Sequence, residues 1–178
     1  MLMELFQNGK EAAFDEIYRR YSQRLLHFMY RLLNQDESKA QDMLHDVFIR
    51  LVERPDRFDT TRNFQSWIFT VCSNECKKQH RSAHDHVDVE QGLHIGIPSE
   101  VKLDRIDQKG FRQALRSELQ LLSYDHQCTF ILRFQENFEV REVAEIMNCS
   151  EGTVKSRSHY CLKKLAAELA VYNPINTI

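Results

Sequence analysis

The stretch of residues 141–165 constrains the fold of this chain more than any other. Apolar residues recur at helical spacing through its first part, and a polar triplet at 148–150 interrupts them. Ser150 suits a helix N-cap, because its hydroxyl can accept a hydrogen bond from a free backbone N–H of the next helix. The helix that follows is expected to bury a second apolar stripe, formed by Val154, Cys161, Leu162, Leu165 and Leu169. Two short helices joined in this way predict a helix-turn-helix unit, whose second helix can enter the major groove of DNA.

The face of that second helix opposite its apolar stripe suits DNA contact. Four cations and one acid between residues 151 and 165 give a local charge of +3. Hydroxyl groups can approach base edges, and flanking cations can hold phosphates. An ordinary amphipathic helix with a solvated basic face explains the same pattern. The residues expected to contact DNA are Thr153, Lys155, Ser156, Arg157, Tyr160 and Lys164.

Composition points to an all-α protein of the cytoplasm. The 178 residues include 5 glycines and 3 prolines, so long helices with few breaks are expected. No apolar run approaches 18 residues, and the first residues lack a signal-peptide layout, so we expect no membrane insertion. An odd count of 5 cysteines favours a reducing compartment. Because the net charge is −2, any DNA contact must come from local patches.

Three helices are predicted before residue 83, at about 9–33, 37–53 and 64–82. The second has the most regular apolar face, formed by Ala40, Met43, Leu44, Val47, Phe48, Leu51 and Val52. A loop at 54–63 separates it from the third and carries three arginines and Phe58. A basic loop with an aromatic ring can clamp single-stranded nucleic acid by charge and stacking.

Cysteine and histidine recur every four residues at the end of the third helix, at Cys72, Cys76, His80 and His84. That spacing allows a metal or redox site. Burial explains the cysteines better, since both continue the apolar row of the helix and free cysteine behaves as a small hydrophobic residue. We therefore expect no metal and no cofactor.

The helical period fails after residue 82. Between residues 85 and 104 there are five acids and one lysine, a net charge of −4. This composition predicts a flexible linker at 83–107 that joins two small helical domains, 1–82 and 108–178. The second domain is expected to hold helices at 108–122 and about 124–136 before the helix-turn-helix.

Taken in order, four segments resemble an extracytoplasmic-function sigma factor of the sigma-70 family, the minimal two-domain class. The segments are AFDEIYRRYSQRLLHFMYRLL (13–33), AQDMLHDVFIRLVERPDRFD (40–59), FQSWIFTVCSNECKKQHR (64–81) and LQLLSYDHQCTFILRFQENFEVREVAEIMNCSEGTVKSRSHYCLKKL (119–165). A plain helix-turn-helix regulator would explain 140–165 but not the ordered segments within 13–81.

The resemblance implies a promoter-specificity subunit without a catalytic site. It implies core RNA polymerase as partner, through the β′ clamp helices and the β flap, together with promoter DNA and an anti-sigma factor. The helix at 151–164 would bind the −35 element, and the linker would run toward the RNA exit path. Polymerase contacts are expected at Gln41, Asp42, His45, Asp46 and Phe48. Contacts to the −10 element are expected at Arg57, Phe58, Arg62, Asn63, Trp67, Asn74, Lys77, Lys78 and Arg81.

The chain also departs from the usual pattern of that family. Positions usually held by other residues carry His45, Ser123, Asn137, Ser158, Tyr160 and Cys161. Tyr160 lies on the predicted exposed face, so an altered −35 preference is expected.

Overall fold

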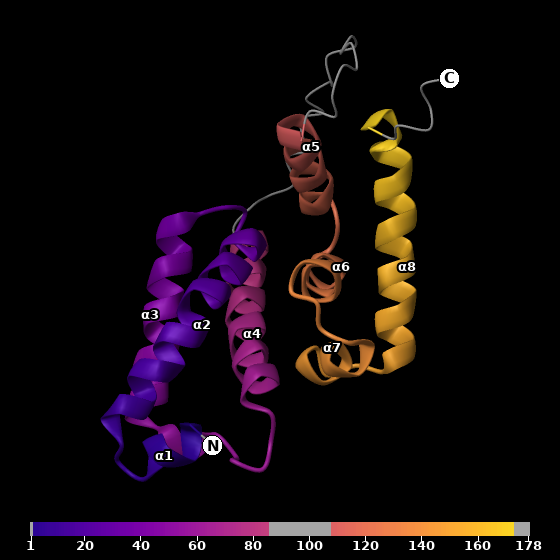
Figure 1. Cartoon of the computed structure of the whole chain (residues 1–178). Coiled ribbons are helices and arrows are strands. Elements are labelled where there is room, and N and C mark those ends of the chain that lie inside the picture. Colours follow the sequence, from indigo (N-terminus) through magenta and orange to yellow (C-terminus); the bar gives the residue numbers. More distant parts are fainter. Residues whose placement is uncertain (1, 86–107, 173–178) are drawn as a thin grey trace.

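The computed structural model describes residues 2–85 and 108–172, and in this part of the chain every regular element is helical (Figure 1). The all-α prediction is therefore confirmed. Most of the predicted linker, residues 86–107, lies outside the described residues.

Three long helices form the N-terminal half. They are α2 (Glu11–Leu32), α3 (Glu37–Glu53) and α4 (Phe64–Asp85), with a single 3₁₀ turn, η1 (Pro55–Arg57), between the last two. The chain reverses after α2 through Asn34 and Gln35, whose φ angles are 54° and 65°. Asp36 then starts α3, because its carboxylate accepts a hydrogen bond from the Lys39 backbone N–H at 3.0 Å.

The predicted core face of α3 is confirmed as far as Leu51. Its members from Ala40 to Leu51 are all buried against the neighbouring helices. Val52 is 50% exposed, so its assignment to the core was wrong. The buried face ends there because Val52 lies in the last turn, followed by the exposed Glu53 and Arg54.

A short N-terminal helix, α1 (Leu2–Gln7), was not predicted. Met3 is buried, and the Phe6 ring lies 5.4 Å from that of Phe14 on α2. The Gln7 side-chain amide donates to the backbone carbonyls of Pro55 at 2.7 Å and Phe58 at 2.8 Å. The helix thus supports the loop that follows α3.

The C-terminal half contains α5 (Gln108–Gln120), α6 (Tyr124–Phe130), α7 (Val140–Ile146), α8 (Glu151–Glu168) and a 3₁₀ turn, η3 (Ala170–Tyr172). The predicted helix at 124–136 is present, but its last turn is a π-helix, η2 (Ile131–Gln135). Asn137 follows with a φ of 59°. Asparagine tolerates this left-handed conformation better than most residues do.

The two halves pack against each other. In Figure 1, α6 and α7 lie between α4 on one side and α8 on the other. One buried apolar cluster runs through both halves, and the Phe69 ring of α4 lies 4.9 Å from the Phe138 ring that precedes α7. A smaller cluster joins α5, α6 and α8 around Leu119 and Cys161.

Candidate nucleic-acid and polymerase interfaces

The helix-turn-helix consists of α7 and α8. The turn between them reverses at Asn148, whose φ is 47°. Ser150 caps α8 as predicted, since its hydroxyl oxygen accepts a hydrogen bond from the Thr153 backbone N–H at 3.0 Å. The Glu142 side chain accepts from the Glu139 backbone N–H at 2.8 Å and so satisfies the start of α7.

We expect Ser150→Ala to lower the free energy of unfolding by about 1 kcal/mol, because one N–H of α8 loses its cap. Urea unfolding measures this loss. Ser123→Ala is the matched control: Ser123 occupies the N-cap position of α6 but makes no capping hydrogen bond there. Equal losses in both variants would contradict a specific capping role for Ser150.

The outward face of α8 carries three of the six predicted −35 residues as exposed side chains. Lys155, Ser156 and Tyr160 are exposed, whereas Thr153, Arg157 and Lys164 are half-buried. The buried stripe is narrower than predicted. It contains Val154, Cys161 and Leu165, while Leu162 is 48% exposed. Leu162 lies one residue, or about 100°, past Cys161 and so turns away from the packed face.

Tyr160 is supported from behind by α6. Its ring lies 4.7 Å from that of His126, and the His126 Nδ1 atom lies 2.7 Å from the Ser123 hydroxyl. Burial and the nearby Arg157 charge lower the pKa of His126. The unusual Cys161 is fully buried, and the Ser158 hydroxyl is buried without a hydrogen-bond partner.

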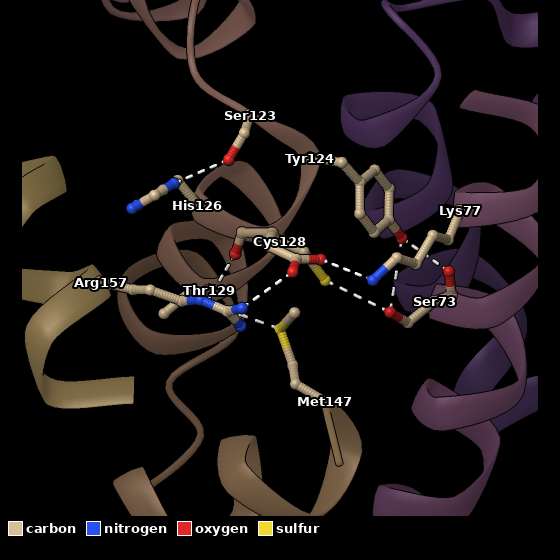
Figure 2. Close-up of polar contacts among 10 residues, drawn as sticks. Ser73, Lys77, Ser123, Tyr124, His126, Cys128, Thr129, Met147 and Arg157 are labelled. Carbon is tan, nitrogen blue, oxygen red and sulfur yellow. Dashed lines mark hydrogen bonds and ion pairs between the residues drawn. The ribbon is translucent and has the colours of Figure 1, made fainter. Parts of the chain in front are cut away.

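Arg157 does not point freely outward. Its Nη2 atom lies 2.8 Å from Asp125 Oδ2 on α6, and Lys77 Nζ of α4 lies 2.8 Å from Oδ1 of the same carboxylate. Figure 2 shows Arg157 and Lys77 reaching α6 from opposite sides. Burial raises the pKa of Asp125, but the Lys77 hydrogen bond and the charges of Lys77, Arg157 and His126 outweigh it, so the pKa lies below its ordinary value.

A groove between α3 and α4 brings together most of the predicted −10 residues. Its volume is about 440 Å³. Its polar and aromatic lining includes Arg57, Trp67, Asn74, Lys77, Lys78 and Arg81 from the predicted set. Arg50 and Arg54 line it as well and were not predicted, although Arg54 is one of the three arginines counted in the loop. Glu75 crosses the groove and pairs with Arg50 at 2.9 Å and Lys78 at 2.8 Å.

Three predicted −10 residues are placed differently. Phe58 is 2% exposed, with its ring 5.2 Å from both Phe64 and Trp67, so in this arrangement the ring packs in the core and presents little surface for stacking on a base. Asn63 caps α4, because its side-chain oxygen accepts from the Ser66 backbone N–H at 3.1 Å. Arg62 is exposed but does not line the groove.

The polar face of α3 carries the predicted polymerase contacts. Gln41, Asp42, His45 and Asp46 are all exposed along it. Phe48 is 4% exposed and packs against Tyr18, with ring centroids 4.8 Å apart. The ring therefore belongs to the core between α2 and α3 and does not lie on the exposed polar face.

Cys72 and Cys76 are core residues, which confirms the interpretation from their spacing. Both are fully buried, and the Cys76 thiol lies 3.6 Å from Met43 Sδ. Burial raises the pKa of both thiols, so neither is a ready nucleophile. Within residues 2–82 and 109–172, no three His, Cys, Asp or Glu side chains are grouped to hold a metal ion.

Two family models match the chain, one over each half. Residues 17–85 match "Sigma-70 region 2", and residues 112–165 match "Sigma-70, region 4". The chain belongs to the sigma-70 family. Relatives place this sigma factor in the extracytoplasmic-function class. The RNA polymerase sigma factor CarQ of Myxococcus xanthus is 26% identical over 164 residues, which cover 92% of each chain. The ECF RNA polymerase sigma factor SigL of Mycobacterium tuberculosis is 27% identical over 162 residues, covering 90% of this chain and 91% of SigL.

Solved structures share the fold of this sigma factor. The sigma factor RpoE of Bartonella quintana, in complex with the anti-sigma factor NepR, superposes with a TM-score of 0.68 at 25% identity, covering 89% of this chain and 97% of RpoE. CnrH, in complex with the cytosolic domain of CnrY, gives 0.71 at 20% identity, with 96% of each chain covered, and supports the fold alone. No helix in the described part of this sigma factor is long and apolar enough to cross a membrane.

Proposed function

We propose that this alternative sigma factor binds core RNA polymerase in the cytoplasm and directs it to promoters, without catalysing a reaction itself. The observation that carries the proposal is the cationic groove between α3 and α4. Besides its cations it holds Trp67 and Asn74. Charge together with a half-buried aromatic ring in the lining suits a single strand of DNA, which is what the −10 element presents once it is opened.

A division of labour follows the two halves. We place polymerase and −10 contacts in 1–82 and −35 contacts in 108–178, with 83–107 as the linker. The −35 duplex would lie on α8, where Lys155, Ser156 and Tyr160 face solvent. Arg157 would complete that face if its guanidinium contacted DNA while it stayed paired with Asp125.

The polar face of α3 is the proposed docking surface for the β′ clamp helices. This face offers two carboxylates, Asp42 and Asp46, beside Gln41 and His45. The C-terminal half is the proposed docking surface for the β flap. Because RpoE forms a complex with the anti-sigma factor NepR, we also expect an anti-sigma partner for this chain.

The test is transcription by core RNA polymerase with and without the purified chain, on fragmented genomic DNA. New, discrete transcripts that depend on the chain would support the proposal. Failure to bind core polymerase, together with specific binding to duplex DNA by the chain alone, would instead establish a stand-alone helix-turn-helix regulator.

We expect Lys155→Ala to reduce the salt dependence of promoter binding by about one counterion, because one phosphate contact is lost. The slope of log affinity against log salt, measured on the holoenzyme, reports this change. Lys10→Ala removes the same charge from an exposed position before α2 and is the control. An unchanged slope in Lys155→Ala would remove this residue from the −35 interface.

A further inference from the structure

The side chain of Lys77 is held at the boundary between the two halves of the chain. It lines the groove beside Asn74, Lys78 and Arg81, but its Nζ atom is bonded to Asp125 in the first turn of α6. Nζ also lies 5.9 Å from the centre of the Tyr124 ring. A cation that would serve DNA in the groove is therefore already paired with a carboxylate of the other half.

Neighbouring contacts fix this turn of α6 on α4. The Tyr124 hydroxyl donates to the Ser73 carbonyl at 2.6 Å, and the Ser73 hydroxyl lies 3.4 Å from the Cys128 thiol. Tyr124 and Cys128 are both buried. Figure 2 shows Tyr124, Ser73 and Lys77 together on this side of α6. The carboxylate is thus aimed at Lys77 by packing and is not a chance surface partner.

The Asp125 carboxylate resembles a backbone phosphate in its negative charge and its two terminal oxygen atoms. It presents two anionic oxygens, and one cation lies on each, with both distances at 2.8 Å. Of these two cations, Arg157 belongs to the same half of the chain as Asp125, and Lys77 does not. Separation of the halves would release Lys77 and leave Arg157 paired.

We propose that Asp125 is an internal competitor of DNA: while α6 is packed on α4, its carboxylate occupies the place of a backbone phosphate at Lys77. Single-stranded DNA in the groove and the packed arrangement then exclude each other at this residue. This regulation rests on the proposed −10 role of α4. The free chain then binds single-stranded DNA more weakly than it would if Lys77 were not paired with Asp125.

Equilibrium binding of the full chain to a fluorescein-labelled oligothymidylate of about ten nucleotides, at low ionic strength, tests the proposal. We expect Asp125→Asn to bind about three- to fivefold more tightly, the scale of one partly exposed ion pair. Asp15→Asn removes the same charge from an exposed position on α2 and should not gain as much. In a Lys77→Gln background, Asp125→Asn should gain no more than Asp15→Asn does, because the released cation is missing. Far-UV circular dichroism checks that each variant is folded.

Each other result overturns the proposal in a different way. Equal gains in Asp125→Asn and Asp15→Asn would show an effect of net charge alone. If Asp125→Asn binds no more tightly but Lys77→Gln binds more weakly, Asp125 does not compete with DNA, while Lys77 still contributes to −10 binding. If Lys77→Gln weakens binding neither alone nor together with Asp125→Asn, both the competition by Asp125 and the −10 role of Lys77 are contradicted.

Discussion

Glu136→Gln is expected to lower the free energy of unfolding by about 2–3 kcal/mol, at or just below the lower end of the range for a broken buried ion pair. The Glu136 side chain is 6% exposed and bridges two arginines of α2. Its Oε2 lies 2.7 Å from Arg24 Nε, and its Oε1 lies 2.8 Å from Arg31 Nη1. The loss is not larger because both arginines are about one-third exposed, at 35% and 37%, and solvent screens their charges.

Urea unfolding and small-angle scattering together test this expectation. Because Glu136 belongs to the C-terminal half and its partners to α2, the variant should also be more extended. Glu16→Gln is the matched control, since Glu16 likewise pairs with two arginines, but both of these, Arg19 and Arg20, are exposed and lie on the same helix as Glu16. The control should change stability little. A Glu136→Gln variant as stable and compact as the wild type would show that the buried carboxylate does not hold the halves together.

Phe69→Ala is expected to cost about 3–5 kcal/mol, the usual cost of removing a buried phenyl ring. Phe69 is fully buried on α4, with its ring 5.0 Å from Phe28 and 4.9 Å from Phe138. The Arg24 guanidinium lies 5.1 Å from the ring centre. One substitution therefore leaves a cavity in the N-terminal core and removes the aromatic contact to the C-terminal half.

Thermal and urea unfolding measure the cost, and Phe134→Ala provides the comparison. Phe134 is 38% exposed and should lose far less. The unfolding of Phe69→Ala should also be less cooperative, because the shared core is interrupted at the boundary between the halves. A loss no larger than that of Phe134→Ala would contradict the placement of Phe69 at the centre of the shared core.

The sequence predicted the features that depend on the spacing of apolar residues and on local contacts. The helix at 37–53 and the cap at Ser150 follow from local spacing and local hydrogen bonds, and both are present. The burial of Cys72 and Cys76 follows from the same row of apolar positions. Most of the groove could also be anticipated, because Trp67 and all its cations except Arg50 lie on α4 and on the loop before it.

Other features were out of reach because they depend on residues far apart in the chain. Phe58 lies in a loop without a period, so nothing local showed that its ring packs under Trp67. The helix α1 has only 6 residues and is held by contacts to α2 and to the loop after α3. The pairs Lys77–Asp125 and Arg24–Glu136 join positions 48 and 112 residues apart, and no pattern of spacing connects them.

The amide of Gln7 gives the loop after α3 a shape of its own. By donating to the carbonyls of Pro55 and Phe58, it fixes the backbone on both sides of Arg57. A segment that is ordered beforehand loses little conformational entropy when a ligand arrives. This part of the groove is therefore preorganised. If a DNA strand binds here as proposed, little of the free energy of its contacts would be lost to ordering the loop.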